Sequence, residues 1–324
     1  MNTPLTRRRF NLAAAAALAT PAAWAQAWPA KPIRIIVPYP PGGFTDVTAR
    51  LIGQKLQERL GQTVLVDNKA GANGTIGVAE LARSAADGTT FGIVIAAHAA
   101  NSSLYAKLPY DARKDLVAVS LIGLSPLVAA VNKDAPFKTA QELVAYAKRN
   151  PGKISFGSSG NGSAAHLTTE LLKSLTQTDM VHIPYKGAAA ALQDLMGGQI
   201  QLLFDAASGL ISPGKAGQVR LIGVSAERRL PALPEVPTFI EQGITGFSGS
   251  TWAGLLAPAR TPPAIIKQLS DEVARVVRLD DVKTRLEGMG TVPVGSTPEA
   301  FAAFIDAETA KWGKVIQEAK VKLD

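Results

Sequence analysis

Short apolar segments rich in β-branched residues alternate with helical patterns along almost the whole chain after residue 30. Residues 33–37 and 63–66 are the first two such segments, and apolar residues at helical spacing between 47 and 60 separate them. Alternation of this kind predicts parallel sheets with helices on both faces. The 324 residues contain more segments than one ordinary sheet holds. We therefore predict two α/β lobes, each a mostly parallel sheet flanked by helices.

The later segments continue this pattern and indicate where the chain changes lobe. The other predicted strands are 91–95, 117–122, 127–131, 154–157, 181–184, 200–204, 220–224 and 252–256. The predicted helices are approximately 45–60, 75–84, 139–150, 164–175, 188–196, 262–279 and 297–320. Changeovers near 122–126 and 243–251 place residues 26–123 and 247–324 in the first lobe and residues 124–246 in the second. Ligands of open α/β sheets bind beyond the carboxyl ends of the strands, and in a two-lobe protein those ends face a cleft.

The first 25 residues have the pattern of an export signal. Three consecutive arginines, Arg7 to Arg9, precede an alanine-rich apolar run, and Ala23-Trp24-Ala25 fits a cleavage site. The arginines followed by Phe10 match a twin-arginine signal, although an ordinary secretory signal would show the same three-part pattern. We therefore predict a periplasmic protein. Cleavage removes three arginines and no acids, which lowers the formal charge from +8 to +5.

Composition excludes several classes of function. The absence of cysteine rules out disulfides, thiolate metal sites and cysteine catalysis, and three histidines leave little material for a metal centre. We predict no cofactor and no metal. A mild positive charge, no dense Lys/Arg stripe and 6% aromatic residues make nucleic-acid binding a poor interpretation. No second apolar stretch approaches 18 residues, so we expect the mature protein to be soluble.

The loop 38–46 is the first candidate ligand site, because it joins a predicted strand to a predicted helix. Its glycines allow the backbone to approach a ligand, and the helix N-terminus that follows suits a carboxylate or phosphate. A tight turn in which an aspartate favours the helix dipole is the structural alternative, and for Phe44 a place in the core is favoured over contact with a ligand. The candidate ligand residues here are Tyr39, Gly42, Gly43, Phe44, Thr45 and Asp46.

The loop 157–166 is the second candidate, and it is dense in glycine and hydroxyl residues. Gly160-x-Gly162-x-x-Ala165 fits a dinucleotide fingerprint, but the next strand ends in Pro184-Tyr185-Lys186 and lacks the acid that a ribose would need. Neither a P-loop lysine nor a nucleophile elbow is present. An anion cradle of backbone N–H groups and serine hydroxyls remains. Its candidate residues are Ser158, Gly162, Ser163 and His166.

Three further strand ends carry polar residues that could reach a cleft. Ala97, His98 and Asn101 follow the third strand, Tyr185 follows the strand 181–184, and Asp205 follows the strand 200–204. Loop capping is an equally good explanation for the first group. Asp205 suits a ligand hydroxyl or amine, or the ordering of a neighbouring loop. We recognise no catalytic residues, because no nucleophile–base pair or histidine–carboxylate metal pair is apparent in the sequence.

These motifs together resemble the Bug family, the periplasmic substrate-binding receptors of tripartite tricarboxylate transporters. The resemblance covers essentially the whole mature chain. The matching segments are Trp28-Pro-x-Lys31-Pro32-Ile33, 39–46, Val66-Asp67-Asn68-Lys69-x-Gly71-Ala72-x-Gly74, 86–90, 156–167, and 184–199 from Pro184-Tyr185-Lys186-Gly187 to Gly197-Gly198-Gln199. Ala96-Ala97 departs from the hydroxyl residue that the family often has after its third strand.

The resemblance implies a two-lobe periplasmic binding protein of the Venus flytrap type, similar to type II. One ligand carboxylate would lie between residues 42–46 and 158–163, partly through ordered waters, with Tyr185 and Asp205 at the far end. The implied function is non-enzymatic capture of a small aliphatic or aromatic mono-, di- or tricarboxylate. The implied partners are the membrane subunits of a transporter, and the implied state is a monomer. The alternatives are an exported α/β hydrolase or oxidoreductase, and a sensor partner that presents its ligand to a receptor.

Overall fold

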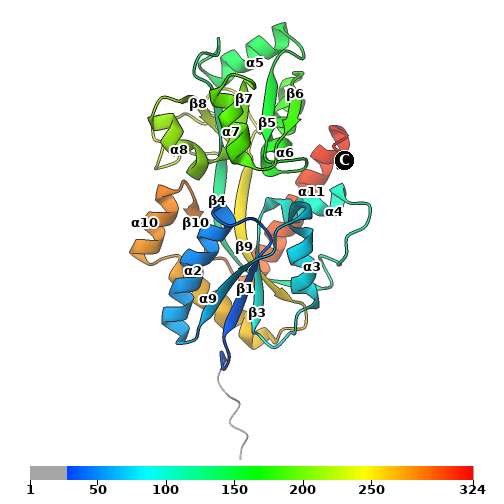
Figure 1. Cartoon of the computed structure of the whole chain (residues 1–324), viewed down its shortest axis with the longest axis vertical. Coiled ribbons are helices and arrows are strands. Elements are labelled where there is room, and N and C mark those ends of the chain that lie inside the picture. Colours follow the sequence, from blue (N-terminus) through cyan, green and yellow to red (C-terminus); the bar gives the residue numbers. More distant parts are fainter. Residues whose placement is uncertain (1–27, 324) are drawn as a thin grey trace, which may run out of the picture.

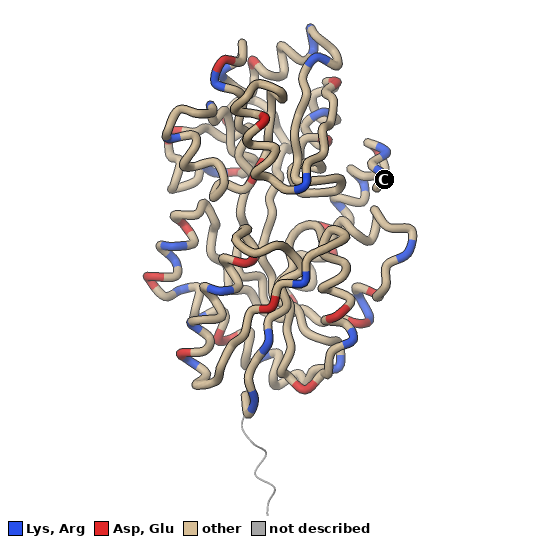
Figure 2. The backbone as a smooth tube through the Cα atoms, in the orientation of Figure 1, with Lys and Arg blue, Asp and Glu red and all other residues tan. Residues whose placement is uncertain are grey.

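The computed structural model describes residues 28–323, and the predicted export signal lies outside them. The chain forms two lobes, one above the other, and two long strands, β4 and β9, cross between them (Figure 1). Figure 2 shows lysine and arginine interspersed with aspartate and glutamate over both lobes, without a continuous basic stripe. Within the described residues, no helix is both long enough and apolar enough to cross a membrane.

The first lobe is built on a sheet in which most strands point the same way. Its strand order is β2-β1-β3-β9-β4, and β10 pairs with the other side of β4. The strands β1 and β2, and β1 and β3, pair in parallel, whereas β9 is antiparallel to both β3 and β4. The bounds are β1 Ile33–Val37, β2 Val64–Asn68, β3 Thr90–Val94, β4 Leu116–Asn132, β9 Ser250–Pro258 and β10 Val292–Pro293.

The second lobe has a smaller sheet in which β5, β6, β7 and β8 all point the same way. The pairs β5–β6 and β5–β7 are parallel, and both β7 and β8 are antiparallel to the second half of β4. The bounds are β5 Ser155–Ser158, β6 Val181–Pro184, β7 Leu202–Ala206 and β8 Val219–Val224. Both sheets are therefore mostly parallel in direction, and their antiparallel pairs involve β4, β9 or β10.

Helices cover both faces of each sheet. Buried side chains from α2, α9 and α10 pack on one face of the first sheet, and those from α3, α4 and α11 pack on the other. In the second lobe α5 and α6 cover one face, and α7 and α8 cover the other. The bounds are α2 Phe44–Leu60, η1 Ala72–Gly74, α3 Thr75–Arg83, α4 Ala96–Leu104, α5 Ala140–Arg149, α6 Ala164–Thr176, α7 Ala188–Met196, α8 Ala207–Lys215, α9 Pro263–Val276, α10 Asp280–Gly288 and α11 Pro298–Glu318.

One strand, β4, replaces the two strands that the sequence predicted at 117–122 and 127–131. Its residues up to Pro126 pair with β9, and its residues from Leu127 to Val131 pair with β7. Gly123 does not interrupt the strand; a Cβ there would lie 2.9 Å from the Val292 carbonyl oxygen, so glycine admits the neighbouring backbone. Pro126 lies where pairing passes from one sheet to the other, a position that tolerates the loss of one N–H donor.

The lobe boundaries predicted after residues 123 and 246 stay predictions, and they lie a few residues from the changes of pairing at Pro126 and Ser250. Three of the α-helices in the described residues were absent from the prediction. They are α4, which begins directly after β3, α8, which contains Pro213, and α10, which follows α9.

Candidate functional site

The carboxyl ends of the parallel strands in the two lobes face each other. Because β9 lies between β3 and β4 and is antiparallel to both, β4 runs in the same direction as β1 and β3. Beyond Pro126, β4 is antiparallel to β7, with Leu127 opposite Ala206. β4 therefore leaves the first sheet at the carboxyl ends of β1 and β3 and enters the second at the carboxyl end of β7. The predicted ligand loops lie on the two sides of this junction (Figure 1).

Helices that follow strands at these facing ends include α2, α4, α6, α7 and α8. In the described chain, no side chain caps α2, α4, α7 or α8, whereas Ser163 caps α6 by accepting the His166 N–H at 3.3 Å. An uncapped N-terminus presents unpaired backbone N–H groups and a partial positive charge, which suits a carboxylate. Residues 38–43 and 158–163 contain no lysine or arginine, so backbone N–H groups and hydroxyls would hold an anion there.

Asp46 organises the first loop through hydrogen bonds within the lobe. Its carboxylate accepts the Gly42 N–H at 2.9 Å, the Asn68 amide at 3.0 Å and the Arg50 guanidinium at 2.9 and 3.1 Å. Burial alone would raise the pKa of Asp46, but the hydrogen bonds from Arg50, Gly42 and Asn68 bring it below its usual value. The residue as a whole is 4% exposed. These contacts make Asp46 a positioning residue for the loop, and its predicted role in binding would act through that loop.

The rest of the first loop divides into exposed backbone and buried side chains. Gly42 and Gly43 are exposed, and Gly42 has a φ of +80°, a conformation that favours glycine. Phe44 is half-buried and packs against the core of the first lobe, and Thr45 is buried. The Tyr39 ring is enclosed against Gly74, where an added Cβ would lie 2.7 Å from the Tyr39 hydroxyl. Burial strongly raises the pKa of Tyr39, so its hydroxyl stays neutral.

Ser158 ties the second loop to the neighbouring strand. Its hydroxyl lies 2.7 Å from His182 Nε2, donates to the Gly160 carbonyl at 3.0 Å and accepts the Gly160 N–H at 3.1 Å. The structure thus forms a serine–histidine contact that the sequence did not reveal. The Ser158 side chain is completely buried, and both ends of its hydroxyl are engaged within the loop. We therefore assign it a positioning role.

Gly162 and His166 complete the second loop. The Gly162 N–H donates to His166 Nδ1 at 3.1 Å, so the other ring nitrogen carries the proton when His166 is neutral. Burial, followed by the charges of His182 and Lys173, lowers the pKa of His166 to about 3, and the His182 ring stacks on it with centroids 3.6 Å apart. Gly162 lies against the first lobe, because a Cβ there would be 2.3 Å from Leu104 Cδ1 of α4.

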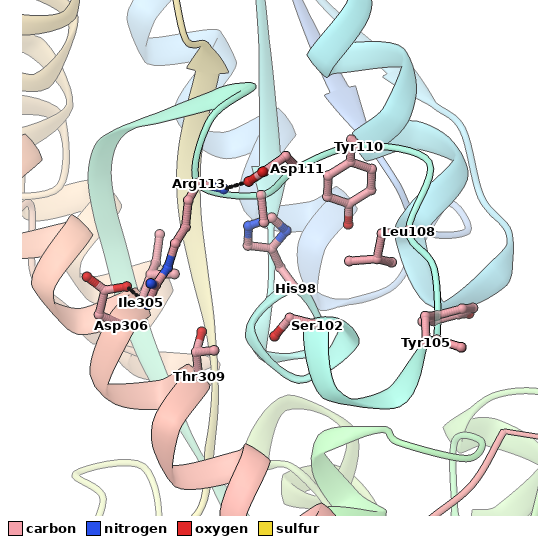
Figure 3. Close-up of a pocket in the computed structure, with 12 residues that line it drawn as sticks. His98, Ser102, Tyr105, Leu108, Tyr110, Asp111, Arg113, Ile305, Asp306 and Thr309 are labelled. Carbon is pink, nitrogen blue, oxygen red and sulfur yellow. Dashed lines mark hydrogen bonds and ion pairs between the residues drawn. The ribbon is translucent and has the colours of Figure 1, made fainter.

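The candidate side chains on α4 lie within the first lobe. The His98 ring stacks parallel to Tyr110, with centroids 6.3 Å apart, and lines a cavity of about 370 Å³ between α4, residues 105–113 and α11 (Figure 3). All residues that line this cavity belong to the first lobe. Asn101 is buried and exchanges hydrogen bonds with Asn73 at 2.9 and 3.1 Å. Ala97 is also buried.

Tyr185 directly follows β6, and Asp205 lies near the end of β7. Both are at the same edge of the second sheet as Ser158. The Tyr185 hydroxyl donates to Asp194 at 2.6 Å, and burial followed by this contact raises the pKa of Tyr185 to about 12. Asp205 keeps partial exposure, yet burial raises its pKa to about 6. In residues 28–323, no group of three or more histidine, aspartate or glutamate side chains is placed to hold a metal ion.

Three contacts at the site were missed because their partners are distant in the sequence: His182 with Ser158, Leu104 with Gly162, and Asn73 with Asn101. His182 is 24 residues from Ser158 on a neighbouring strand. The alternation of strands and helices gave one signal for these contacts, because residues that follow parallel strands lie at the same edge of a sheet. Choosing the partners required the register of β5 and β6, in which Phe156 lies opposite His182.

Two α/β lobes, two crossing strands and ligand loops at facing strand ends define the class of two-lobe periplasmic binding proteins. A family model described as the tripartite tricarboxylate transporter family receptor matches residues 48–321. The chain therefore belongs to this family, which consists of substrate-binding receptors and not enzymes. The resemblance predicted from the motifs is confirmed, as are the fold class and the non-enzymatic character.

Relatives support this membership over nearly the full length. Protein BugT of Bordetella pertussis is 37% identical, over 96% of this chain and 95% of its own. The structure of Rpa4515 from Rhodopseudomonas palustris with adipate has a TM-score of 0.84 and 34% identity, covering 91% of this chain and 99% of that chain. MatC from the same organism, with bound malate, has a TM-score of 0.79 and 31% identity, covering 89% and 100%.

Proposed function

We propose that this protein captures a small carboxylate in the periplasm and delivers it to the membrane subunits of a tripartite tricarboxylate transporter. The observation that carries the proposal is the meeting of uncapped helix N-termini from both lobes at facing strand ends. Backbone N–H groups there match a carboxylate without any lysine or arginine in the two loops. Relatives solved with adipate and with malate support the same ligand class.

Capture would work by closure of the lobes on the ligand. The exposed backbone of residues 42–43 and the accessible part of loop 158–163 supply contacts from opposite lobes, so the full set forms only when the lobes approach. A ligand that binds the closed form better shifts the population toward it. In this mechanism residues 26–123 and 247–324 move as one lobe against residues 124–246, and Asp46, Ser158, Ser163 and His166 hold the loops in shape.

Export supplies the compartment for this function. Residues 1–25 are proposed as a signal that is removed near Ala25, with the three arginines directing the twin-arginine route. Related receptors act in the periplasm, which supports this assignment. Mass spectrometry of the protein recovered from periplasm would give a new N-terminus at Gln26. An intact Met1 in the periplasmic fraction would contradict cleavage.

Thermal unfolding of the mature protein with aliphatic and aromatic mono-, di- and tricarboxylates tests carboxylate capture. A ligand present at 100 times its Kd, and bound only by the folded state, adds about 2.7 kcal/mol and raises the midpoint by several degrees. We expect one subset of carboxylates to raise the midpoint and the matched amides to leave it unchanged. Mass spectrometry of copurified small molecules accompanies the assay. A copurified ligand without a carboxylate, or equal shifts with the amides, would overturn the proposal.

A further inference from the structure

The cavity beside His98 has a buried inner wall and an exposed mouth. None of its lining residues belongs to the ligand loops 38–46 and 158–163. Its inner wall carries His98 and Tyr110, which are 4% and 8% exposed, whereas Ser102 and other exposed residues form its mouth (Figure 3). A cavity of about 150 Å³ is enough to hold benzene. The cavity of about 370 Å³ therefore has room for one substituted ring.

The His98 ring on this wall lacks the hydrogen bonds that the other two histidines have. In the part of the chain that the structure describes, no group bonds to the buried Nδ1 of His98. By contrast, His166 Nδ1 accepts the Gly162 N–H at 3.1 Å, and His182 Nε2 lies 2.7 Å from the Ser158 hydroxyl. A buried polar atom without a partner is costly and uncommon. An imidazole of this kind that lines a cavity points to a hydrogen bond with a ligand.

The inner wall is uncharged, and the charged groups of the mouth already have partners. Burial lowers the pKa of His98 to about 4 and raises the pKa of Tyr110 to about 12, so both side chains are neutral near pH 7. At the mouth, Arg113 pairs with Asp306 at 2.9 Å, and Asp111 accepts the backbone N–H of Arg113 at 3.0 Å. These three charged side chains sum to −1, which disfavours an anion.

The remaining lining suits an aromatic ring. The His98 and Tyr110 rings are within 6° of parallel, with centroids 6.3 Å apart. Tyr105, Leu108 and Ile305 add aromatic and aliphatic surface around them. Aromatic rings pack well beside one another in offset or edge-on arrangements. The cavity thus combines apolar surface for a ring with one imidazole that requires a hydrogen-bond partner.

We propose that this cavity is a second binding site, which takes a small uncharged phenol. The ring of the phenol packs against the apolar lining, and its hydroxyl group pairs with the His98 imidazole. A hydroxyl both donates and accepts, so it matches either tautomer of a neutral imidazole. This ligand class differs from the carboxylates proposed for the facing loops, so the second site stands or falls independently of the receptor function.

Nuclear magnetic resonance of the ¹⁵N-labelled mature protein tests the site. The chain has three histidines, so long-range ¹H–¹⁵N spectra of the imidazoles report on the cavity through His98 and on the second ligand loop through His166 and His182. The probes are phenol itself, toluene, in which a methyl group replaces the hydroxyl, and benzoate, which is an anion. Backbone amide signals of residues 105–113 give the affinity in every variant.

Three variants accompany the wild type. His98→Phe keeps an aromatic ring on the inner wall and removes its hydrogen-bonding nitrogens. Ser102→Trp places a large side chain at the mouth, where Ser102 is exposed. The matched control is Ala310→Trp, at an exposed position of α11 that does not line the cavity. Urea unfolding of each ligand-free variant verifies that it is folded.

We expect phenol to shift the His98 ring signals of the wild type in a saturable manner and to leave those of His166 and His182 in place. Ser102→Trp should bind phenol about tenfold more weakly, and Ala310→Trp should bind it as the wild type does. His98→Phe should also bind phenol about tenfold more weakly, because the buried hydroxyl loses its partner, while its affinity for toluene stays unchanged.

Each of three results would overturn the proposal. The first is the absence of a saturable shift at His98, or shifts confined to His166 and His182, because phenol would then not occupy this cavity. The second is equal or tighter binding of toluene or benzoate by the wild type, which would contradict the ligand class. The third is equal phenol affinity in Ser102→Trp and Ala310→Trp, which would place the binding site elsewhere.

Discussion

Single side chains at the facing strand ends mostly hold the backbone in place, and in the proposed function the ligand contacts are left to the backbone N–H groups. Asp46 accepts from Gly42, Asn68 and Arg50, and Ser158 is bonded to Gly160 and His182. A carboxylate side chain facing an anionic ligand would repel it, so an engaged Asp46 agrees with carboxylate capture. Substitutions at these positions should therefore change affinity through loop geometry.

Ser163→Ala should weaken ligand binding and lower the free energy of unfolding by about 1 kcal/mol through loss of the α6 cap. The matched control is Thr139→Ala, which removes the cap of α5 in the same lobe, where Thr139 accepts the Glu142 N–H at 3.1 Å. Both variants should lose similar stability in urea unfolding, and only Ser163→Ala should lose affinity in calorimetry. Equal affinities of the two variants would remove Ser163 from the site.

His98 gives the protein a predictable loss of stability in acid. Burial lowers the pKa of His98 from its ordinary value of 6.5 to about 4, so between these values the unfolded chain binds a proton that the folded chain does not. The free energy of unfolding should then fall as the pH drops from about 6.5 to about 4. In His98→Phe the loss between pH 7 and pH 4.5 should be smaller. Parallel urea-unfolding profiles of wild type and variant would contradict this account.

At the scale of elements, the second ligand loop rests on α4 of the other lobe. Leu104 of α4 packs in one apolar cluster with Leu167 and Leu171 of α6 and with Trp312 of α11. The loop that precedes α6 reaches the same helix at Gly162. Because α4 begins at β3 and α6 begins at β5, this packing couples the orientation of two of the helices that start at the facing strand ends.

Gly162→Ala should destabilise the protein more than Gly217→Ala. Both glycines have positive φ, +71° and +67°, but an added Cβ meets Leu104 at 2.3 Å only at Gly162 and meets nothing within 4 Å at Gly217. Gly217→Ala measures backbone strain alone, about 1 kcal/mol. Urea unfolding should show a further loss in Gly162→Ala, and Leu104→Ala in the same chain should recover part of it. A double-mutant cycle with zero coupling would exclude the contact.

At the scale of the whole molecule, the topology of β4 decides that the two sets of strand ends face each other. The strand β4 pairs first with β9 and then with β7, so one continuous strand belongs to both sheets. This continuity fixes the relative direction of their strands. α11 adds a third connection, since Lys311 donates to the Ser248 carbonyl at 2.9 Å, just before β9 returns to the first lobe. These links join the two lobes in the described structure.

Ligand binding should make the mature protein more compact. Small-angle X-ray scattering with a saturating carboxylate identified by thermal unfolding should give a smaller radius of gyration than the ligand-free protein. The matched amide serves as the control and should leave the radius unchanged. An unchanged radius together with a clear rise in the unfolding midpoint would show that binding does not involve closure in this receptor.

The sequence by itself determined the fold class and the family, and it predicted the position of the ligand loops. Alternating strands and helices specify the class because their hydrophobic periods are local, and glycine-rich loops after strands mark the binding edge because positive φ is a local requirement. The motifs from residue 28 to residue 199 were sufficient to assign the receptor family.

The tertiary structure decided which candidate side chains form contacts within the protein and which lack a side-chain hydrogen-bond donor. His182 reaches Ser158 from the neighbouring strand, His98 joins a cavity formed with α11, and Asp205 alone among the enclosed acids described lacks a side-chain donor. The sequence also did not predict that β4 continues through Gly123 and Pro126. Each depends on partners distant in the chain, and hydrogen bonding and burial are set by register and packing, which local patterns do not contain.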